Sequence, residues 1–160
     1  MDYKTVYDFS IASFKIGWII ILVVILFSIP IYFGLRDKKS KKNIIAIGYF
    51  IFISIIFLGL VKVQLIDFYK TKSLYKEGKY KIIEGTTEQF VPVGPAGKRK
   101  ESFYINDVFF NYSHFDSSYN GFNKTSLIGG PINKNGQQVR LCYITKDTRN
   151  IILKIELKSD

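Results

Sequence analysis

Few residues in this chain could carry out a chemical reaction, and they lie in its second half. His114 is the one histidine, and it stands two positions before Asp116. A histidine beside a carboxylate can act as a general base, but no nucleophile spacing and no second ligand accompany this pair. The single cysteine, Cys142, excludes an intramolecular disulfide and a multi-cysteine metal site. The sequence therefore predicts no catalytic residue, no metal site and no cofactor.

The long loop from His114 to Gly136 is the segment best suited to binding a partner, because long loops on small domains often carry function. The glycine pair before Pro131 can adopt backbone angles closed to other residues, which leaves its amides accessible to a ligand. The alternative is an ordered loop in which Phe122 is a packing side chain. The candidate partner-binding residues are His114, Phe122, Asn123, Gly129 and Gly130.

The elements that would position this loop begin with two long uncharged runs, residues 16–35 and 43–61. As a helix, each run is about 30 Å long, which is the thickness of the hydrocarbon core of a bilayer. We therefore predict two membrane-spanning helices, over about 16–35 and 44–61, joined by the tight loop 36–42. A chain of this length cannot bury two such helices in a soluble core, and the first run ends without the small residues of a signal-peptide cleavage site.

The second helix is expected to continue past the membrane. Val63, Ile66 and Leu74 recur at helical steps among polar residues, and Gly78 is suited to a left-handed helix stop. The sequence thus predicts a two-helix hairpin over residues 1–77, with the second helix reaching about residue 77. Residues 1–15 are expected to form a helical or loose lead into the first span.

Positive charge is concentrated beside the predicted spans. The formal net charge is +10, and much of it lies in the loop 36–42 and just after the second run. Anionic lipid headgroups are the expected partner of such residues. The candidate headgroup contacts are Arg36, Lys38, Lys39, Lys41, Lys42, Lys62 and Lys70. The positive-inside rule places the loop in the cytoplasm and both termini outside it, although the lysines after the second run favour the reverse.

From Lys79 onward the hydrophobic period changes to two, which predicts a β domain over residues 78–160. Its clearest unit is a hairpin over residues 101–112, in which Asn106-Asp107 forms the turn and Phe103 pairs with Phe110. The core face of this hairpin comprises Phe103, Ile105, Val108, Phe110 and Tyr112.

Three further strands complete the predicted domain. Residues 80–91 are expected to form one strand with a bulge at Gly85. Residues 139–143 and 151–157 are expected to pair around a turn at 146–150, with Ile151, Leu153, Ile155 and Leu157 on one face. The predicted fold class is a membrane helical hairpin plus a small all-β domain, a five-stranded antiparallel barrel or curled sheet similar to OB or SH3-like folds.

The second half also carries a succession of short motifs: Glu84-Gly85, Phe90-Val-Pro92, Glu101-Ser-Phe103, Phe110-Asn-Tyr-Ser113, Gly121-Phe122-Asn123, Gly129-Gly-Pro-Ile132, Val139-Arg-Leu-Cys-Tyr143 and Ile152-Leu-Lys-Ile-Glu156. This succession resembles an uncharacterised group of small bacterial membrane proteins with two N-terminal transmembrane helices and a C-terminal β domain. The resemblance covers residues 78–157. It implies a multi-pass protein of the bacterial plasma (inner) membrane, and it brings no activity, substrate or site residue.

Two classes of function follow. The first is a non-enzymatic membrane-anchored module whose β domain binds a protein, lipid or envelope partner, and the lack of clustered Asp, Glu, His and Cys favours it. The second is an accessory subunit of a membrane enzyme or transport complex. A single-strand nucleic-acid binder is a weaker third alternative, because it would need Tyr104 and Phe109 beside Arg and Lys on one open face.

Overall fold

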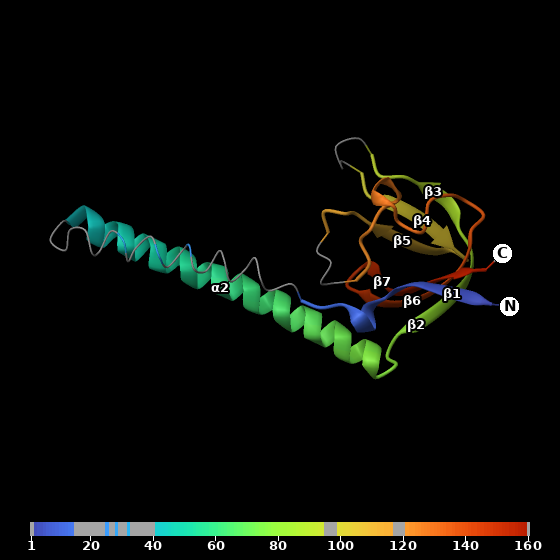
Figure 1. The fold of residues 1–160 in the computed structure, drawn as a ribbon, viewed down its shortest axis with the longest axis horizontal. Coiled ribbons are helices and arrows are strands. Elements are labelled where there is room, and N and C mark those ends of the chain that lie inside the picture. Colours follow the sequence, from blue (N-terminus) through green and yellow to red (C-terminus); the bar gives the residue numbers. More distant parts are fainter. Residues whose placement is uncertain are drawn as a thin grey trace. The chain divides into compact units, whose positions relative to one another are not determined.

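The computed structural model describes residues 2–14, 25, 28, 32, 41–94, 99–116 and 121–159. The chain divides into two compact units, of which one comprises Met1–Ala12 and Phe68–Asp160 and the other Ser13–Asp67. We call the first the β unit. Helix α2 (Lys41–Lys76) begins in the second unit and ends in the β unit (Figure 1). The predicted first span and the loop before Lys41 lie outside the described residues, apart from Ile25, Ser28 and Tyr32.

Helix α2 ends where the sequence predicts. Its last residue is Lys76, and Gly78 has a left-handed φ of 71°. The amide of Gly78 donates to the carbonyl of Tyr75 (3.2 Å), and the amide of Lys79 donates to that of Leu74 (2.9 Å). This pair of bonds is the Schellman motif, which a glycine at the left-handed position favours. The predicted extension of the second helix beyond its uncharged run is therefore confirmed.

Within the described residues, one helical stretch is long and apolar enough to cross a membrane by its length and composition. It covers Ile47–Lys76, and 6% of its most apolar window is buried. A core helix of a soluble protein would be mostly buried instead.

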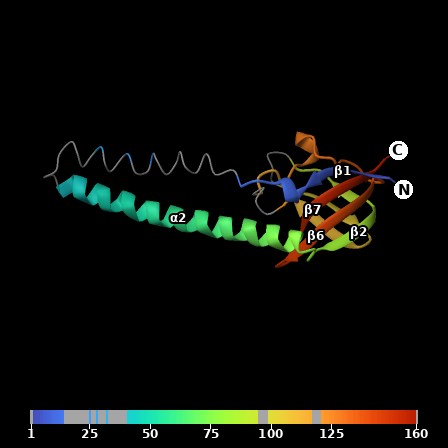
Figure 2. The ribbon, with the colours of Figure 1, turned by 60° about the horizontal axis from the view of Figure 1, so that its bottom comes forward.

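The β unit contains seven strands in the described part of the chain. Figure 2 shows the first sheet, which is antiparallel and has the order β1 (Tyr3–Asp8), β7 (Arg149–Lys158), β6 (Gln138–Lys146) and β2 (Lys81–Thr86). The second sheet has the order β3 (Glu88–Val91), β4 (Glu101–Ile105) and β5 (Val108–Tyr112).

Both sheets contribute side chains to one apolar core, together with two residues of the β5–β6 loop. The buried members are Phe103, Ile105, Phe110, Tyr112, Phe122, Ile132, Val139, Leu141, Tyr143, Ile152 and Ile155. Alternating residues of a strand point to opposite faces, so each sheet gives one face to this core.

The predicted β4–β5 hairpin is confirmed in its register. Phe103 lies opposite Phe110, and Ile105 lies opposite Val108. Asn106 and Asp107 form the turn with φ values of 44° and 64°, which a two-residue hairpin turn of this kind requires. Four of the five predicted core residues are buried, and Val108 is partly buried.

The predicted fold class is wrong. The described residues form one long helix and two sheets of four and three strands, and these strands do not close into a barrel. Two features explain the difference. Residues 3–8, expected to be a helical or loose lead, form strand β1 and pair with β7. The predicted single strand 80–91 is divided into β2 and β3, which belong to different sheets.

The division falls at Thr87, not at the predicted bulge. The Thr87 hydroxyl donates to the carbonyl of Lys134 (2.8 Å) and accepts from the amide of Gln137 (3.0 Å), so the turn before β6 holds this corner. Gly85 pairs regularly with Val139, and the predicted bulge there is wrong. A Cβ at Gly85 would lie 2.8 Å from the Asn106 side chain, and this close approach explains the glycine.

The regular alternation predicted for the last strand is also wrong in part. The β6–β7 register shifts between Cys142 and Tyr143, where Cys142 lies opposite Lys154 and Tyr143 lies opposite Ile152. The shift leaves Leu153 without an opposite residue, as in a β-bulge. Ile152 and Ile155 therefore both belong to the core cluster, whereas Leu153 is buried outside it.

Candidate functional site

The β5–β6 loop, described over residues 113–116 and 121–137, is held against the β unit by a buried carboxylate. Glu101 is fully buried, and its oxygens accept from the amide of Ser126 at 2.9 and 3.1 Å and from the Ser126 hydroxyl. These bonds fix the short 3-10 helix Ser126–Ile128. A buried carboxylate requires such partners, and this segment of the loop is therefore ordered by the core.

Gly129 and Gly130, predicted to offer free amides, use those amides within the loop. The Gly129 amide donates to the Ser126 carbonyl (3.1 Å), and the Gly130 amide donates to the Thr125 carbonyl (2.8 Å). Gly129 has a φ of 78°, and a Cβ at Gly130 would collide with the carbonyl oxygen of Lys124. The expected accessibility of these amides is wrong, because the glycines serve a tight backbone turn.

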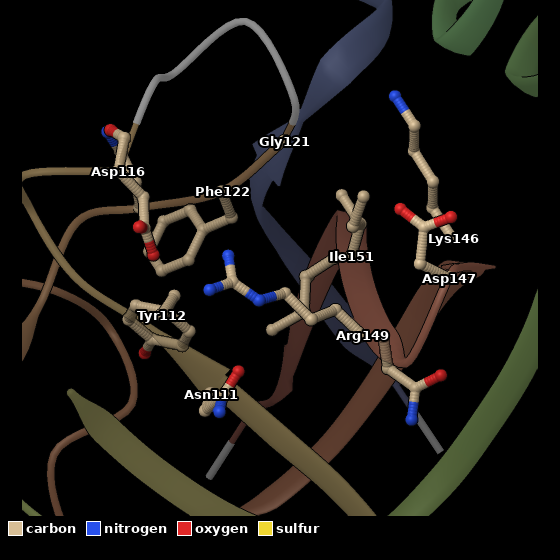
Figure 3. A pocket seen from close by; sticks show the side chains of 12 residues that line it. Asn111, Tyr112, Asp116, Gly121, Phe122, Lys146, Asp147, Arg149 and Ile151 are labelled. Atoms are coloured by element: carbon tan, nitrogen blue, oxygen red, sulfur yellow. The ribbon is translucent and has the colours of Figure 1, made fainter.

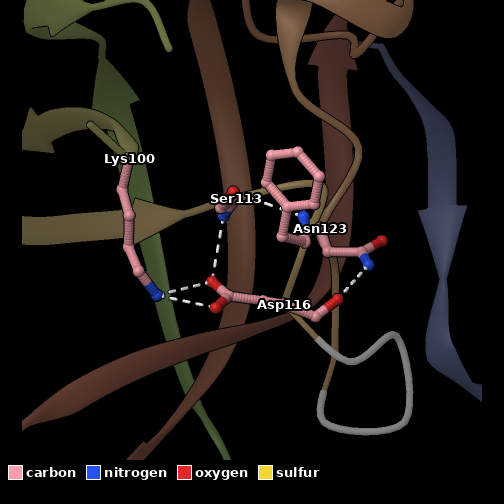
Figure 4. A network of polar contacts seen from close by, with 5 residues as sticks. Lys100, Ser113, Asp116 and Asn123 are labelled. Atoms are coloured by element: carbon pink, nitrogen blue, oxygen red, sulfur yellow. Dashed lines mark hydrogen bonds and ion pairs between the residues drawn. The ribbon is translucent and has the colours of Figure 1, made fainter. Parts of the chain in front are cut away.

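His114 and Asp116 each have another partner. The His114 Nδ1 lies 3.3 Å from the Thr125 hydroxyl, and its ring packs on Phe115. Asp116 accepts from Lys100 Nζ at 2.7 Å and from the Ser113 amide at 3.0 Å (Figure 4). The two side chains are thus used to hold the loop.

Phe122 and Asn123, the other predicted loop residues, have different positions. The Phe122 ring is buried and makes edge contacts with Tyr7 (4.9 Å between centroids) and Tyr112 (5.2 Å). Its amide donates to the Ile152 carbonyl at 2.9 Å. Asn123 is partly exposed, and its amide nitrogen donates to the Asp116 carbonyl at 2.6 Å (Figure 4). Phe122 therefore has the position of a packing side chain.

A pocket of about 230 Å³ lies where this loop meets the β6–β7 hairpin (Figure 3). Its wall includes the rings of Tyr112 and Phe122, the backbone of Gly121, and the side chains of Asn111, Arg149 and Ile151. A Cβ at Gly121 would lie 2.5 Å from Ile151, so the loop contacts β7 directly. Strand β5, the β5–β6 loop and the β6–β7 hairpin build this pocket. Of its lining residues, the sequence had singled out Phe122 and Asn123 in the loop and the turn at 146–150, but it gave no signal that they lie together.

Tyr112 carries the one buried side-chain polar atom without a hydrogen-bond partner in the described part of the chain, its hydroxyl oxygen. Burial raises the pKa of this hydroxyl well above its ordinary value, and the nearby charge of Glu101 raises it further. Tyr112 is therefore neutral over the physiological range and contributes an aromatic wall to the pocket.

A polar network crosses the first sheet on the face away from the core. Glu156 accepts from Arg140 Nε at 2.5 Å and from Lys154 Nζ at 2.6 Å, and the Thr5 hydroxyl donates to it at 3.2 Å. Burial alone would raise the pKa of Glu156, but the bonds from Arg140 and Lys154 outweigh it and lower the pKa. The network joins β1, β6 and β7 and leaves none of its charges without a partner.

The predicted headgroup contacts fall into three groups. Arg36, Lys38 and Lys39 lie outside the described residues. Lys41 and Lys42 are the first two residues of helix α2. Lys62 and Lys70 lie further along the same helix with exposed side chains.

Comparisons of the chain with protein-family models, with curated proteins and with solved structures give no match. In the described ranges, no group of three or more His, Cys, Asp and Glu side chains could hold a metal ion.

Proposed function

We propose that this protein is a membrane-anchored binding module, in which helix α2 lies in the bilayer and holds the β unit at the membrane surface. The observation that carries the proposal is the exposure of large apolar side chains along α2 without a polar side. Ten of them are exposed: Tyr49, Ile51, Phe52, Ile55, Ile56, Leu58, Leu60, Val63, Ile66 and Tyr69. Such a surface is costly in water and favourable in lipid.

The last part of helix α2, from Phe68, belongs to the β unit and is fixed there by two contacts. Phe68 is buried, and its ring packs edge-on against Phe9 with 5.6 Å between centroids. Lys72 Nζ donates to the carbonyl of Ala12 at 2.7 Å. The part of helix α2 from Phe68 onward is therefore packed within the β unit itself. With α2 in a bilayer, Lys62 and Lys70 would reach anionic headgroups.

The position of β1 supports two membrane crossings. Residues 3–8 pair with β7 in the same unit that contains the end of α2. We propose that the uncharged run 16–35, which lies in the sequence between β1 and α2, crosses the membrane as well as α2. We further propose, from the lysine density of the loop 36–42, that this loop is cytoplasmic and the β unit extracytoplasmic, in a bacterial plasma membrane.

The partner proposed for the β unit is a protein, a lipid or an envelope component. The outer face of the second sheet carries Tyr104 and Phe109, whose rings lie 5.0 Å apart. Strands β3, β4 and β5 contain no lysine or arginine, so the basic residues that a nucleic-acid surface needs do not accompany these rings. We therefore do not propose nucleic acid as the partner.

Extraction of membranes with alkaline carbonate tests the anchor. We expect the full chain to stay with the membrane, and the double variant Ile55→Lys/Leu58→Lys to be held less firmly, since each central lysine costs about 2.5–3.5 kcal/mol of insertion free energy. Ile82→Lys places the same charge on an exposed position of β2 and is the matched control. Release of the unsubstituted chain would refute the anchor.

Labelling with an impermeant thiol reagent tests the two crossings and the orientation. Lys4 and Lys158 are exposed residues of the paired strands β1 and β7. With Cys142 replaced by serine, a cysteine at either position should be labelled from the outer side of intact cells. Labelling of the two positions from opposite sides would refute the double crossing, and labelling of both only after lysis would refute the orientation alone.

A further inference from the structure

The pocket between the β5–β6 loop and the β6–β7 hairpin is lined in part by a cationic side chain, that of the exposed Arg149. Arg149 is the first residue of β7 and lies opposite Lys146 in the hairpin. Figure 3 shows its guanidinium group directed between the rings of Tyr112 and Phe122 and the side chain of Ile151. In the described part of the chain, this guanidinium makes no hydrogen bond or ion pair.

The acidic side chains beside the pocket do not neutralise Arg149. The Asp116 carboxylate already accepts from Lys100 and from the Ser113 amide (Figure 4). Asp147 lies at the hairpin turn with a φ of 55°, and Figure 3 shows its carboxylate on the other side of Ile151 from the guanidinium. The positive charge in the pocket is therefore available to a ligand.

The polar and apolar groups around Arg149 complement an anion attached to a small apolar body. Asn111 lines the pocket, and its carboxamide makes no hydrogen bond with the described residues. The Asn150 amide, by contrast, donates to the Phe109 carbonyl at 3.0 Å. Arg149 and Asn111 thus offer unused N–H donors, and Tyr112 and Phe122 offer aromatic surfaces beside them.

The size of the pocket limits the ligand. Its volume of about 230 Å³ holds a carboxylate or a phosphate with one ring or a short chain attached, but not a large molecule. The planar guanidinium fork matches two oxygens of a carboxylate or a phosphate.

We propose that this pocket binds an oxyanion, a carboxylate or a phosphate monoester, with Arg149 as the bidentate donor and Asn111 as a second donor. The apolar part of the ligand contacts Tyr112 and Phe122. The site is independent of the proposed membrane anchor, because its residues all belong to the β unit. The anion comes from a soluble molecule or from a lipid headgroup.

Titration calorimetry on the full chain in a zwitterionic detergent tests the site, with phenyl phosphate and benzoate as probes. We expect saturable binding of at least one probe, and Arg149→Gln should weaken it by about tenfold or more, because a bidentate charge-assisted contact is lost. Arg149→Lys keeps the charge and loses the fork, so its effect should be smaller, about threefold. Asn111→Ala should also weaken binding.

Arg99→Gln is the matched control, since Arg99 is exposed, lies outside the pocket and carries the same charge. Three results would overturn the proposal. Neither probe binds the unsubstituted chain, Arg149→Gln binds the probe as tightly as the unsubstituted chain, or Arg149→Gln and Arg99→Gln lose the same amount of affinity. A thermal melt of each variant separates loss of the site from loss of folding. Reconstitution of the chain with phosphatidic acid identifies the source of the anion. If phosphatidic acid competes with the soluble probe, the anion is a lipid headgroup, and if it does not compete, the anion belongs to a soluble ligand.

Discussion

The core of the β unit and the surface of helix α2 are built from the same kinds of side chain with opposite exposure. Phe110 in the core is 0% exposed, whereas Ile55 on the helix is 64% exposed. In the β unit, two sheets and a loop cover one another's apolar faces. On α2, exposed apolar side chains lie on several sides, which is the distribution that a surrounding lipid phase favours.

This difference teaches that apolar content alone does not show whether protein or lipid covers a side chain. The spacing of apolar residues along the sequence indicates it. A strand that alternates leaves one face for the protein to cover, whereas an uninterrupted apolar run leaves no polar face for water. Substitutions in the two regions should therefore have different consequences, in folding for the β unit and in membrane insertion for α2.

The largest effect is expected for Phe110→Ala. Phe110 stacks on Phe103 and makes an edge contact with Tyr143, so its removal leaves a cavity between the two sheets. We expect the free energy of unfolding of the β unit to fall by about 3–5 kcal/mol. Denaturant unfolding of the full chain in detergent, followed by near-ultraviolet circular dichroism, measures it.

Phe109→Ala is the control for this prediction. Phe109 is the preceding residue of the same strand, and it is 41% exposed on the opposite face. It should cost less than about 1 kcal/mol. Equal losses for the two variants would mean that the core does not lie between the sheets as described.

A somewhat smaller effect is expected for Phe122→Ala, at about 3 kcal/mol, because Phe122 joins the loop to Tyr7 and Tyr112 at the border of the core. Phe115→Ala removes the same ring from an exposed position of the same loop and should be nearly neutral. The same unfolding measurement compares them. A neutral Phe122→Ala would show that the ring serves a partner and not the core.

Glu156→Gln should have an intermediate effect that depends on pH. The folded-state pKa of Glu156 lies below its ordinary value of 4.5. Burial raises this pKa, but the bonds from Arg140 and Lys154 lower it by more. A lowered pKa means that the carboxylate stabilises the fold above pH 4.5 and loses this contribution as the pH falls through the folded value. At pH 7 we expect a loss of about 1–2 kcal/mol in Glu156→Gln.

A series of unfolding curves from pH 7 to pH 3 checks the sign. The difference between the unsubstituted chain and Glu156→Gln should shrink towards pH 3. Glu88→Gln, at an exposed position of β3, is the control and should show little difference at any pH. A difference that grows on acidification would contradict the assignment.

The smallest effect on the β unit is expected for Ile55→Ala in helix α2. Its side chain is exposed and lies in the other unit, so the free energy of unfolding of the β unit should change by less than about 0.5 kcal/mol. The unfolding curve of the β unit in detergent tests this. A loss comparable to that of Phe110→Ala would show that α2 is packed into a protein core, and the contrast between the two regions would fail.

Local patterns predicted the elements whose structure depends on neighbouring residues. The β4–β5 hairpin was predictable in register, because Asn106-Asp107 accept positive φ and the flanking residues alternate. The end of α2 was predictable because Gly78 accepts the left-handed conformation. The apolar character of α2 was equally plain, because no charge interrupts residues 43–61.

The loop and the pocket show where such patterns stop being informative. Gly129 was correctly expected to adopt a special backbone angle, whereas Gly130 does not have a positive φ and is explained by its close approach to the Lys124 carbonyl. The amides of both glycines proved to be used, by the carbonyls of Ser126 and Thr125. Whether a glycine amide is free depends on which carbonyls lie nearby. Arg149 was part of a predicted turn, and its place among Tyr112, Phe122 and Asn111 depends on the packing of three separate segments.

By itself, the sequence determined the long apolar helix with its glycine stop, the period-two segments and the tight hairpin turn, since these follow from sterics and hydrophobic period over a few residues. Only the tertiary structure decided that residues 3–8 form a strand, that Thr87 divides β2 from β3, and that a bulge at Leu153 shifts the inward face of β7. The physical reason is that strand pairing joins residues far apart in the chain: Tyr3 lies opposite Lys158, and Thr87 is held by Lys134 and Gln137. Short-range propensity carries no information about such partners.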